Sequence, residues 1–305
     1  PEPDPALLDA HYHLGPTLWW TRQIDRARAV LQTAVRLRPD HAEARYYLGL
    51  ALKSSGELMA AIEELETSVR LDAAIPAAAL QLGIALRDVG DTEGAIVQLQ
   101  RAVSLDPASA EARNALGLAL LQHGDGDAAT DTFRTLVTSH PDFHTGRLNL
   151  GTTLMQRGDL EGATAVLRDL IARDAANAAA HYNLGVTLKQ RDDFAGAEAA
   201  LRRAIELSAT LPDAPFTLGV VLWQTGRPEE AVTAFRQAIA LRPDYDEAHY
   251  MLGTVLRQLG EGDAALAAFR ESIRLRPVAA ESHLGLGQLL QQRGAGVEFL
   301  GQRFA

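Results

Sequence analysis

The chain of 305 residues contains no cysteine, few aromatic residues and no long apolar run. The absence of cysteine excludes disulfides, thiolate nucleophiles and cysteine metal sites. No apolar stretch approaches the roughly 18 residues that a membrane-spanning helix needs, so no direct membrane span is expected. Aromatic residues make up only 6% of the chain while Ala and Leu dominate, which favours an all-helical protein.

Positive charge is also in short supply, with a formal net charge of −10 at pH 7 and a sequence pI near 5.4. An acidic chain is a poor partner for nucleic acid or an anionic membrane, so neither is expected. The chain begins at Pro1 without a signal-peptide pattern, which indicates a processed or cut product. Together with the lack of cysteine, this favours an exported or periplasmic bacterial protein over a cytoplasmic one.

A fixed period of 34 residues organises almost the whole sequence. Leu-Gly pairs recur at this spacing without an insertion, with their glycines at Gly15, Gly49, Gly83, Gly117, Gly151, Gly185, Gly219, Gly253 and Gly287. Twelve residues after each of the first eight glycines stands an alanine, from Ala27 to Ala265, and four residues later a Leu or Phe. Apolar positions at helical spacing on both sides of a turn predict pairs of helices that pack against each other.

This pattern resembles that of the tetratricopeptide repeat (TPR) family. The resemblance implies an all-α, right-handed α-solenoid (superhelix) of 34-residue helix-turn-helix repeats, in which neighbouring repeats stack to bury a continuous core. We expect an N-terminal segment over 1–7 and a ninth first helix from Ala280 to about Arg293, followed by a capping tail up to residue 305 that contains Phe299, Leu300 and Phe304. The eight complete repeats are predicted over 8–41, 42–75, 76–109, 110–143, 144–177, 178–211, 212–245 and 246–279.

Local signals predict the ends of the helices. A glycine closes most first helices, and an acid such as Asp91, Asp159 or Glu57 then opens the second helix and complements its N-terminal dipole. Pro16 stands inside the first helix, where it removes a hydrogen bond, so we expect this helix to kink or restart near Gly15.

No motif for catalysis or metal binding withstands inspection. The glycine-rich stretches lack the spacing of a phosphate-binding loop, and the acidic turns lack the alternating oxygen ligands of a calcium loop. His181, His249 and His283 share one repeat position on separate helices, where we interpret them as packing or surface residues. We therefore expect no enzyme activity, no cofactor and no metal.

A possible binding surface follows from positions 2, 5, 9, 12 and 13 of each repeat, which the helical period places on one stripe. In the TPR family this stripe lines the concave groove. Position 2 is mostly acidic, position 5 often aromatic, position 9 largely aliphatic and position 13 glutamine in six consecutive repeats. The candidate groove residues are Trp19, Trp20, Tyr46, Lys53, Arg87, Gln122, Asn149, Gln156, Tyr182, Asn183, Gln190, Phe216, Trp223, Gln224, Tyr250 and Gln258.

The residue types on this stripe indicate which kinds of ligand it could bind. Glutamine amides can pair with the backbone of an extended chain, although glutamine is also simply a good helix former. The family's carboxylate clamp needs basic residues at positions 2 and 5, where this chain has acids and aromatics, so binding of chaperone tails is not expected. An apolar floor with acidic edges instead suits a peptide of mixed apolar and basic character, or a partner helix.

Three functions remain open at this point. The leading one is a non-enzymatic scaffold that binds a protein or peptide in the groove. A second is the substrate-recruiting array of a larger enzyme, because Asn149 and Asn183 precede Leu-Gly pairs as in the asparagine ladder of the O-GlcNAc transferase repeat domain. The third is self-assembly through the terminal repeats, as a homo-oligomer or within a larger complex. For the adjacent Trp19 and Trp20, we expect both rings to lean toward the groove, or the segment 1–10 to fold over them as a cap.

Overall fold

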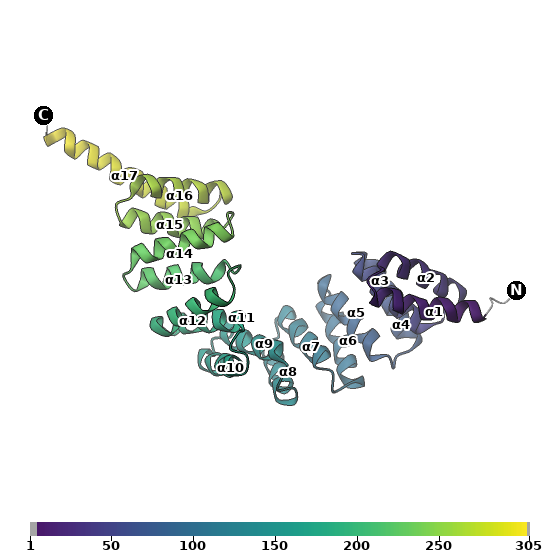
Figure 1. The fold of residues 1–305 in the computed structure, drawn as a ribbon. Helices are drawn as coiled ribbons and strands as arrows, with labels where there is room; N and C mark the ends of the chain where they lie inside the picture. The colour runs from purple at the N-terminus through teal and green to yellow at the C-terminus, as the bar shows by residue number, and fades with distance from the viewer. Residues whose placement is uncertain (1–4, 304–305) are drawn as a thin grey trace. The chain divides into compact units, whose positions relative to one another are not determined.

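The computed structural model describes the backbone of residues 5–303 and the side chains of residues 10, 12–292 and 294. Between residues 5 and 303 the chain forms seventeen α-helices and no strand (Figure 1). The predicted all-α fold is confirmed, and first and second helices alternate along the chain as the 34-residue period requires.

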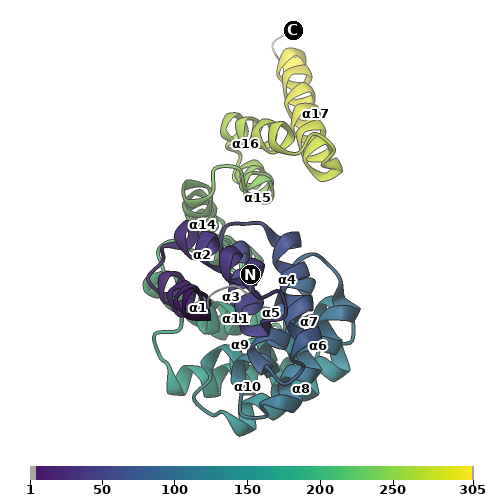
Figure 2. The ribbon, with the colours of Figure 1, turned by 90° about the vertical axis from the view of Figure 1, so that its right-hand side faces the viewer.

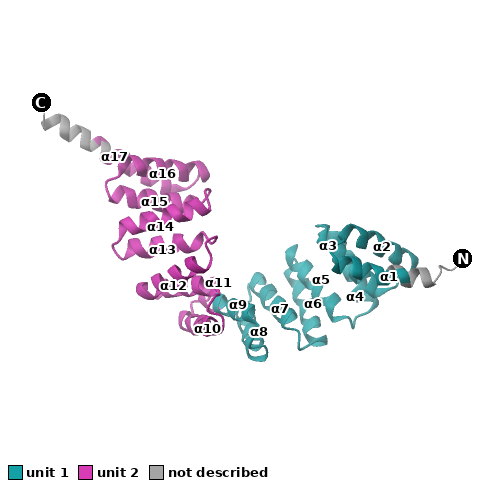
Figure 3. Cartoon of the chain, viewed as in Figure 1, with its two compact units in different colours: residues 1–153 teal, residues 154–305 magenta. Residues whose placement is uncertain are grey.

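The helices form two compact units, residues 1–153 and 154–305, with the boundary inside α9 (Figure 3). The helices up to this boundary are α1 (Pro5–Trp20), α2 (Ile24–Leu37), α3 (Ala42–Ser54), α4 (Leu58–Leu71), α5 (Pro76–Asp88), α6 (Thr92–Leu105), α7 (Ala110–His123), α8 (Gly126–Ser139) and α9 (His144–Gln156). The helices that follow are α10 (Leu160–Arg173), α11 (Ala178–Gln190), α12 (Phe194–Leu207), α13 (Asp213–Gln224), α14 (Pro228–Leu241), α15 (Asp246–Gln258), α16 (Gly262–Leu275) and α17 (Ala280–Arg303).

The two helices of a repeat approach most closely at the glycine of the Leu-Gly pair. A Cβ built onto Gly83 would come within 2.5 Å of Leu99, and one built onto Gly117 would come within 2.5 Å of Phe133. Real Cβ contacts are never this short, so only glycine lets the second helix place a large side chain here. Leu99 and Phe133 are fully buried as a result, as are their counterparts in the other complete repeats.

The turn between the paired helices has two recurring features. Glycines such as Gly90 and Gly226 adopt positive φ values of 88° and 76°, the left-handed conformation that closes a first helix. Arg22 and Asp192 occupy the same position with φ values of 61° and 58°, so two repeats hold this conformation without glycine. Asp91 then caps the second helix, because its carboxylate accepts a hydrogen bond of 3.0 Å from the Gly94 amide.

The histidines of the shared repeat position hold the exit turns between repeats. His249 Nε2 lies 3.0 Å from the carbonyl oxygen of Pro243, and His283 Nε2 lies 2.8 Å from that of Pro277. Arg113 makes the equivalent bond of 2.8 Å to the Pro107 carbonyl, so the side chain at this position stabilises the exit turn. Within the described residues, no group of three His, Asp or Glu side chains is placed to hold a metal ion.

The first and last helices differ from the sequence-based expectations. α1 is one helix from Pro5 to Trp20 with Pro16 inside it, so a restart near Gly15 is wrong, and the alternative of a kink there stays a prediction. Residues 5–10 belong to the same helix as the tryptophans, and the start of this helix lies about 20 Å from the two rings along its axis. These residues therefore cannot fold over the rings as a cap. α17 continues past Arg293 to Arg303. The side chains of Phe299 and Leu300, and all of Phe304, lie outside the described residues, as do residues 1–4.

Replacing Ala197 by Leu should lower the free energy of unfolding by about 1–3 kcal/mol, because Ala197 is fully buried against the first helix of its repeat. The measurement is urea denaturation followed by circular dichroism. Ala199 provides the matched control, since it lies on the exposed side of the same helix. Its replacement by Leu should change stability by less than about 0.5 kcal/mol. Equal effects of the two substitutions would contradict this account of the packing.

Candidate functional site

The aromatic side chains at position 5 are largely used in packing between helices. The Phe216 ring lies 5.8 Å from the Phe235 ring and 4.8 Å from the Tyr245 ring, and Tyr250 lies 6.1 Å from Phe269. All these distances join ring centroids. Phe216 and Tyr250 are therefore partly buried by contacts between helices, which leaves only part of each ring free for a ligand.

The acids at position 2 are paired with residues of the chain itself. Asp213 accepts hydrogen bonds of 3.1 Å from Arg242 and 3.0 Å from the Tyr245 hydroxyl, and Arg242 also lies over the Tyr245 ring at 4.3 Å. Burial, and next the bond to Asp213, raise the pKa of Tyr245 well above its usual value. Glu43 likewise accepts a bond from the Tyr12 hydroxyl. The predicted acidic edge is therefore partly neutralised, which weakens the expectation of a basic ligand.

In the first unit, three candidate residues meet at the C-terminal ends of α3, α5 and α7. The Lys53 ammonium donates a 3.2 Å hydrogen bond to Gln81, and the Gln122 amide donates one of 3.2 Å to the backbone carbonyl of Arg87. Arg87 itself pairs with Asp88 at 2.9 Å. Burial lowers the pKa of Lys53, and Asp88 and Glu111 partly offset that effect.

The first unit holds two further candidates, Tyr46 and Asn149. Tyr46 is half-buried with its ring 4.9 Å from that of Tyr47, and burial raises its pKa to about 12. Asn149 donates a 2.7 Å hydrogen bond to Asn114 on the preceding first helix. Both side chains thus have partners inside the protein.

The two tryptophans differ in their surroundings, and the expectation that both lean toward the groove stays a prediction. Trp19 packs against a core cluster that includes Leu18 and Leu52, and its indole donates a 3.2 Å hydrogen bond to Ser54. Trp20 is 70% exposed, with its ring edge-on to that of Trp19 at 4.8 Å.

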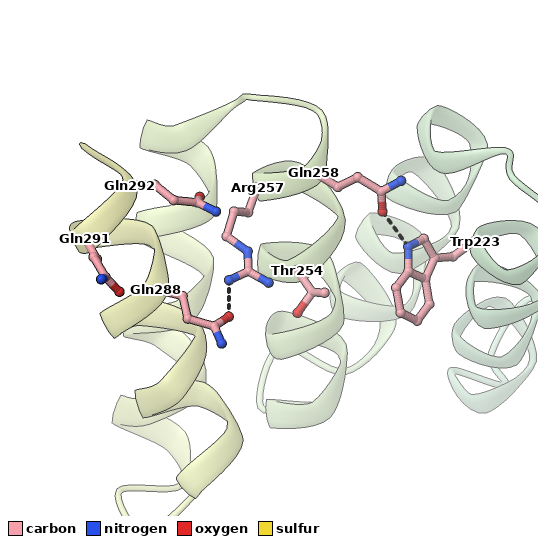
Figure 4. A pocket seen from close by; sticks show the side chains of 7 residues that line it. All are labelled: Trp223, Thr254, Arg257, Gln258, Gln288, Gln291 and Gln292. Carbon is pink, nitrogen blue, oxygen red and sulfur yellow. Dashed lines mark hydrogen bonds between the residues drawn. The ribbon is translucent and has the colours of Figure 1, made fainter. Parts of the chain in front are cut away.

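In the second unit, an open groove of about 460 Å³ crosses three first helices, at the C-terminal parts of α13 and α15 and the middle of α17 (Figure 4). Trp223 forms one wall, and its indole donates a 2.8 Å hydrogen bond to Gln258. Arg257 donates to the amide oxygen of Gln288 in the middle of the groove. The lining residues are Trp223, Thr254, Arg257, Gln258, Gln288, Gln291 and Gln292.

The sequence predicts only part of this groove. Trp223 and Gln258 are among the predicted groove residues, whereas Arg257, Gln288 and Gln291 are not, although each stands at position 9 or 12 of the same stripe. The repeat positions of these three residues alone are enough to place them on the stripe. What the sequence did not reveal is that α17 places three glutamines beside Arg257.

The remaining candidates lie in the second unit outside this groove. Gln156, Gln190 and Gln224 are exposed at the ends of their helices, while Tyr182 and Asn183 are half-buried. Burial raises the pKa of Tyr182.

Comparison with protein families agrees with the repeat pattern. Family models described as tetratricopeptide repeat match residues 12–79, 144–169, 177–244, 216–277 and 250–302, and one described as TPR repeat matches 83–124. The chain belongs to the TPR family. Among curated proteins, none matches its sequence.

Solved TPR structures share the fold. A chain of the APC/C heterotetramer Cut9–Hcn1 has a TM-score of 0.62 at 18% identity, over 90% of this chain and 54% of the other, so this chain spans about half the length of that relative. PilF of Pseudomonas aeruginosa has a TM-score of 0.61 at 21% identity, over 71% and 98%. YrrB, described as a TPR protein with an unusual peptide-binding site, has 0.50 at 20%, over 59% and 92%.

Membership of the TPR family makes the chain a protein-interaction scaffold of a fold that is typically non-enzymatic. Among the described residues, no helix is both long and apolar enough to cross a bilayer.

The tryptophan pair gives a direct test of the two environments. Trp19→Gln should lower the free energy of unfolding by about 2 kcal/mol or more, because it removes core packing and the bond to Ser54. Trp20→Gln should cost at most about 1 kcal/mol, since only the ring-edge contact is lost. Thermal and urea denaturation measure both. A larger loss for Trp20 than for Trp19 would show that the exposed ring is structural.

Proposed function

We propose that this TPR scaffold binds an extended peptide segment of a protein partner in the groove between Trp223 and Gln292. The observation that carries this proposal is the lining itself, which combines one tryptophan, one arginine, one threonine and four glutamines around about 460 Å³ of open space.

The chemistry of the groove suits an extended backbone. Each glutamine amide offers donors and an acceptor, which is the same pair of functions that a peptide unit presents. An extended segment has unpaired N–H and C=O groups along its whole length, whereas a helix has satisfied its own. The indole of Trp223 adds an apolar wall for one side chain of the peptide, as aromatic residues do at binding hot spots.

The charge of the groove selects among peptides. Among the described side chains that line it, Arg257 is the only charged one, and its contact with Gln288 holds the guanidinium in place. A carboxylate of the ligand can replace this amide oxygen and make a stronger, charge-assisted bond. We therefore expect an acidic or apolar peptide, in contrast to the peptide of mixed apolar and basic character, or the partner helix, that the sequence alone predicts.

The test is selection of peptides from a random phage-displayed library on the purified chain, followed by titration of the synthetic binders. The double variant Gln288→Glu, Gln292→Glu removes two amide donors and places carboxylates beside Arg257 without changing side-chain size. Its affinity for the selected acidic peptides should fall at least about tenfold, which corresponds to about 1.4 kcal/mol.

The matched control makes the same change outside the groove, as Gln156→Glu, Gln190→Glu. This variant should keep the affinity of the wild type, and both variants should keep the wild-type melting temperature because all four glutamines are exposed. Equal losses in the two variants, or no loss in the first, would show that the groove is not where the peptide binds.

A further inference from the structure

A pocket of about 250 Å³ opens in the first unit, where the N-terminal ends of α5 and α7 meet the C-terminal end of α6. These three helices contact one another within the stack (Figure 2). The floor of the pocket is apolar and includes Leu80 and three alanines, Ala77, Ala102 and Ala112. Its polar side chains, Asp106 and Ser109, come from the exit turn between α6 and α7.

The seventh repeat shows what occupies the same repeat positions elsewhere in the chain. Tyr245 at position 34 places its ring 4.8 Å from that of Phe216 at position 5, measured between centroids. Arg242 at position 31 lies over the Tyr245 ring at 4.3 Å and donates a 3.1 Å hydrogen bond to Asp213 at position 2. In this repeat a ring and a cation of the exit turn therefore cover the first helix.

The third repeat has smaller side chains at these positions, and its charge is reversed. Ser109 stands at position 34 and Leu80 at position 5, so no aromatic ring fills the space between the exit turn and the first helix. Position 2 is Ala77, and position 31, which holds the cation in the seventh repeat, is Asp106. The third repeat thus provides the acid and the apolar floor but neither the ring nor the cation.

The Asp106 carboxylate is partly buried and has a partner only in the backbone of its own turn. Its Oδ1 accepts a 3.1 Å hydrogen bond from the Ala108 amide, and no arginine or lysine among the described residues pairs with it. The neighbouring Arg101 and Arg113 instead bind backbone carbonyl oxygens of exit turns, at 3.1 and 2.8 Å. A carboxylate at the edge of an apolar pocket favours a cation that has an apolar stem.

We propose that this pocket binds an arginine side chain of a partner protein. The methylene stem packs on Leu80 and the alanines, and the guanidinium donates charge-assisted hydrogen bonds to Asp106. Sites for whole small-molecule ligands enclose roughly 300–1,000 Å³, so a pocket of about 250 Å³ suits one side chain of a longer ligand.

This pocket is independent of the proposed peptide groove. It lies in the first unit and shares no lining residue with the groove of the second unit. The two sites also prefer opposite charges, since Asp106 attracts a cation and Arg257 attracts a carboxylate. Failure of one proposal therefore leaves the other standing.

The probes are three capped tripeptides, acetyl-Gly-X-Gly-amide, in which X is arginine, citrulline or tyrosine. Citrulline has nearly the shape of arginine without its charge. Each is titrated into the full chain with ¹³C-methyl-labelled alanine, so that the signals of Ala77, Ala102 and Ala112 report entry into the pocket. The arginine peptide should shift these signals saturably. The citrulline peptide should bind at least about threefold more weakly, as expected for the loss of a partly exposed ion pair.

The variant Asp106→Asn tests the charge of the pocket. Asparagine keeps the size of the side chain and the acceptor for the Ala108 amide, so the turn should be retained. The arginine and citrulline peptides should then bind with equal affinity. An unchanged preference for arginine in this variant would show that Asp106 does not hold the guanidinium.

The variant Ser109→Tyr tests the place of binding. It restores the type of side chain that the seventh repeat has at position 34, which should fill the pocket and abolish binding of the arginine peptide. Ser109→Ala is the matched control, because both changes remove the 3.1 Å bond from the Ala112 amide to the Ser109 hydroxyl and only the first fills the pocket. The alanine variant should bind as the wild type does.

Three further results would overturn the proposal. Absence of shifts at the three alanines with the arginine peptide would show that arginine does not enter the pocket. Tighter binding of the tyrosine peptide, unaffected by Asp106→Asn, would make it a site for an aromatic side chain. Loss of arginine binding in the groove variant Gln288→Glu, Gln292→Glu would place the interaction in the second unit.

Discussion

The close approach of a first-helix glycine to a second-helix Leu or Phe is the contact on which each repeat depends. It brings two backbones near enough for the large side chain to be wholly buried, as Leu65 is against Gly49 and Phe235 against Gly219. Burial of one such side chain contributes about 1.5–3 kcal/mol, and the 34-residue period repeats the gain in every helix pair. The turn glycines and aspartate caps then fix where each helix ends.

The same close stacking decides which residues remain available to a ligand. Position 5 aromatics such as Phe216 pack within the stack, and position 2 acids such as Asp213 pair with an arginine and a tyrosine of the exit turn. What stays open lies further along the first helices, where positions 9, 12 and 13 carry Trp223, Arg257 and the glutamines. The stripe therefore has two parts that the sequence does not distinguish. Positions 2 and 5 are used in packing and pairing, whereas the later positions remain open.

In α17 this contact is missing among the described residues. Gly287 and Leu290 retain the residue types that make a helix crossing, but no described residue covers them, so a structural motif becomes an exposed apolar surface.

The sequence by itself determined the repeat length, the helix order and the glycine, alanine and Leu or Phe of each crossing, because these depend on contacts within one 34-residue unit. It also indicated Trp223 and Gln258 through their shared register. Only the tertiary structure decided that Pro16 stays inside one helix, that Trp19 is packed while Trp20 is exposed, and that Arg257 meets three glutamines of α17. These outcomes depend on which side chains of neighbouring repeats meet, and the period of a single helix does not specify that.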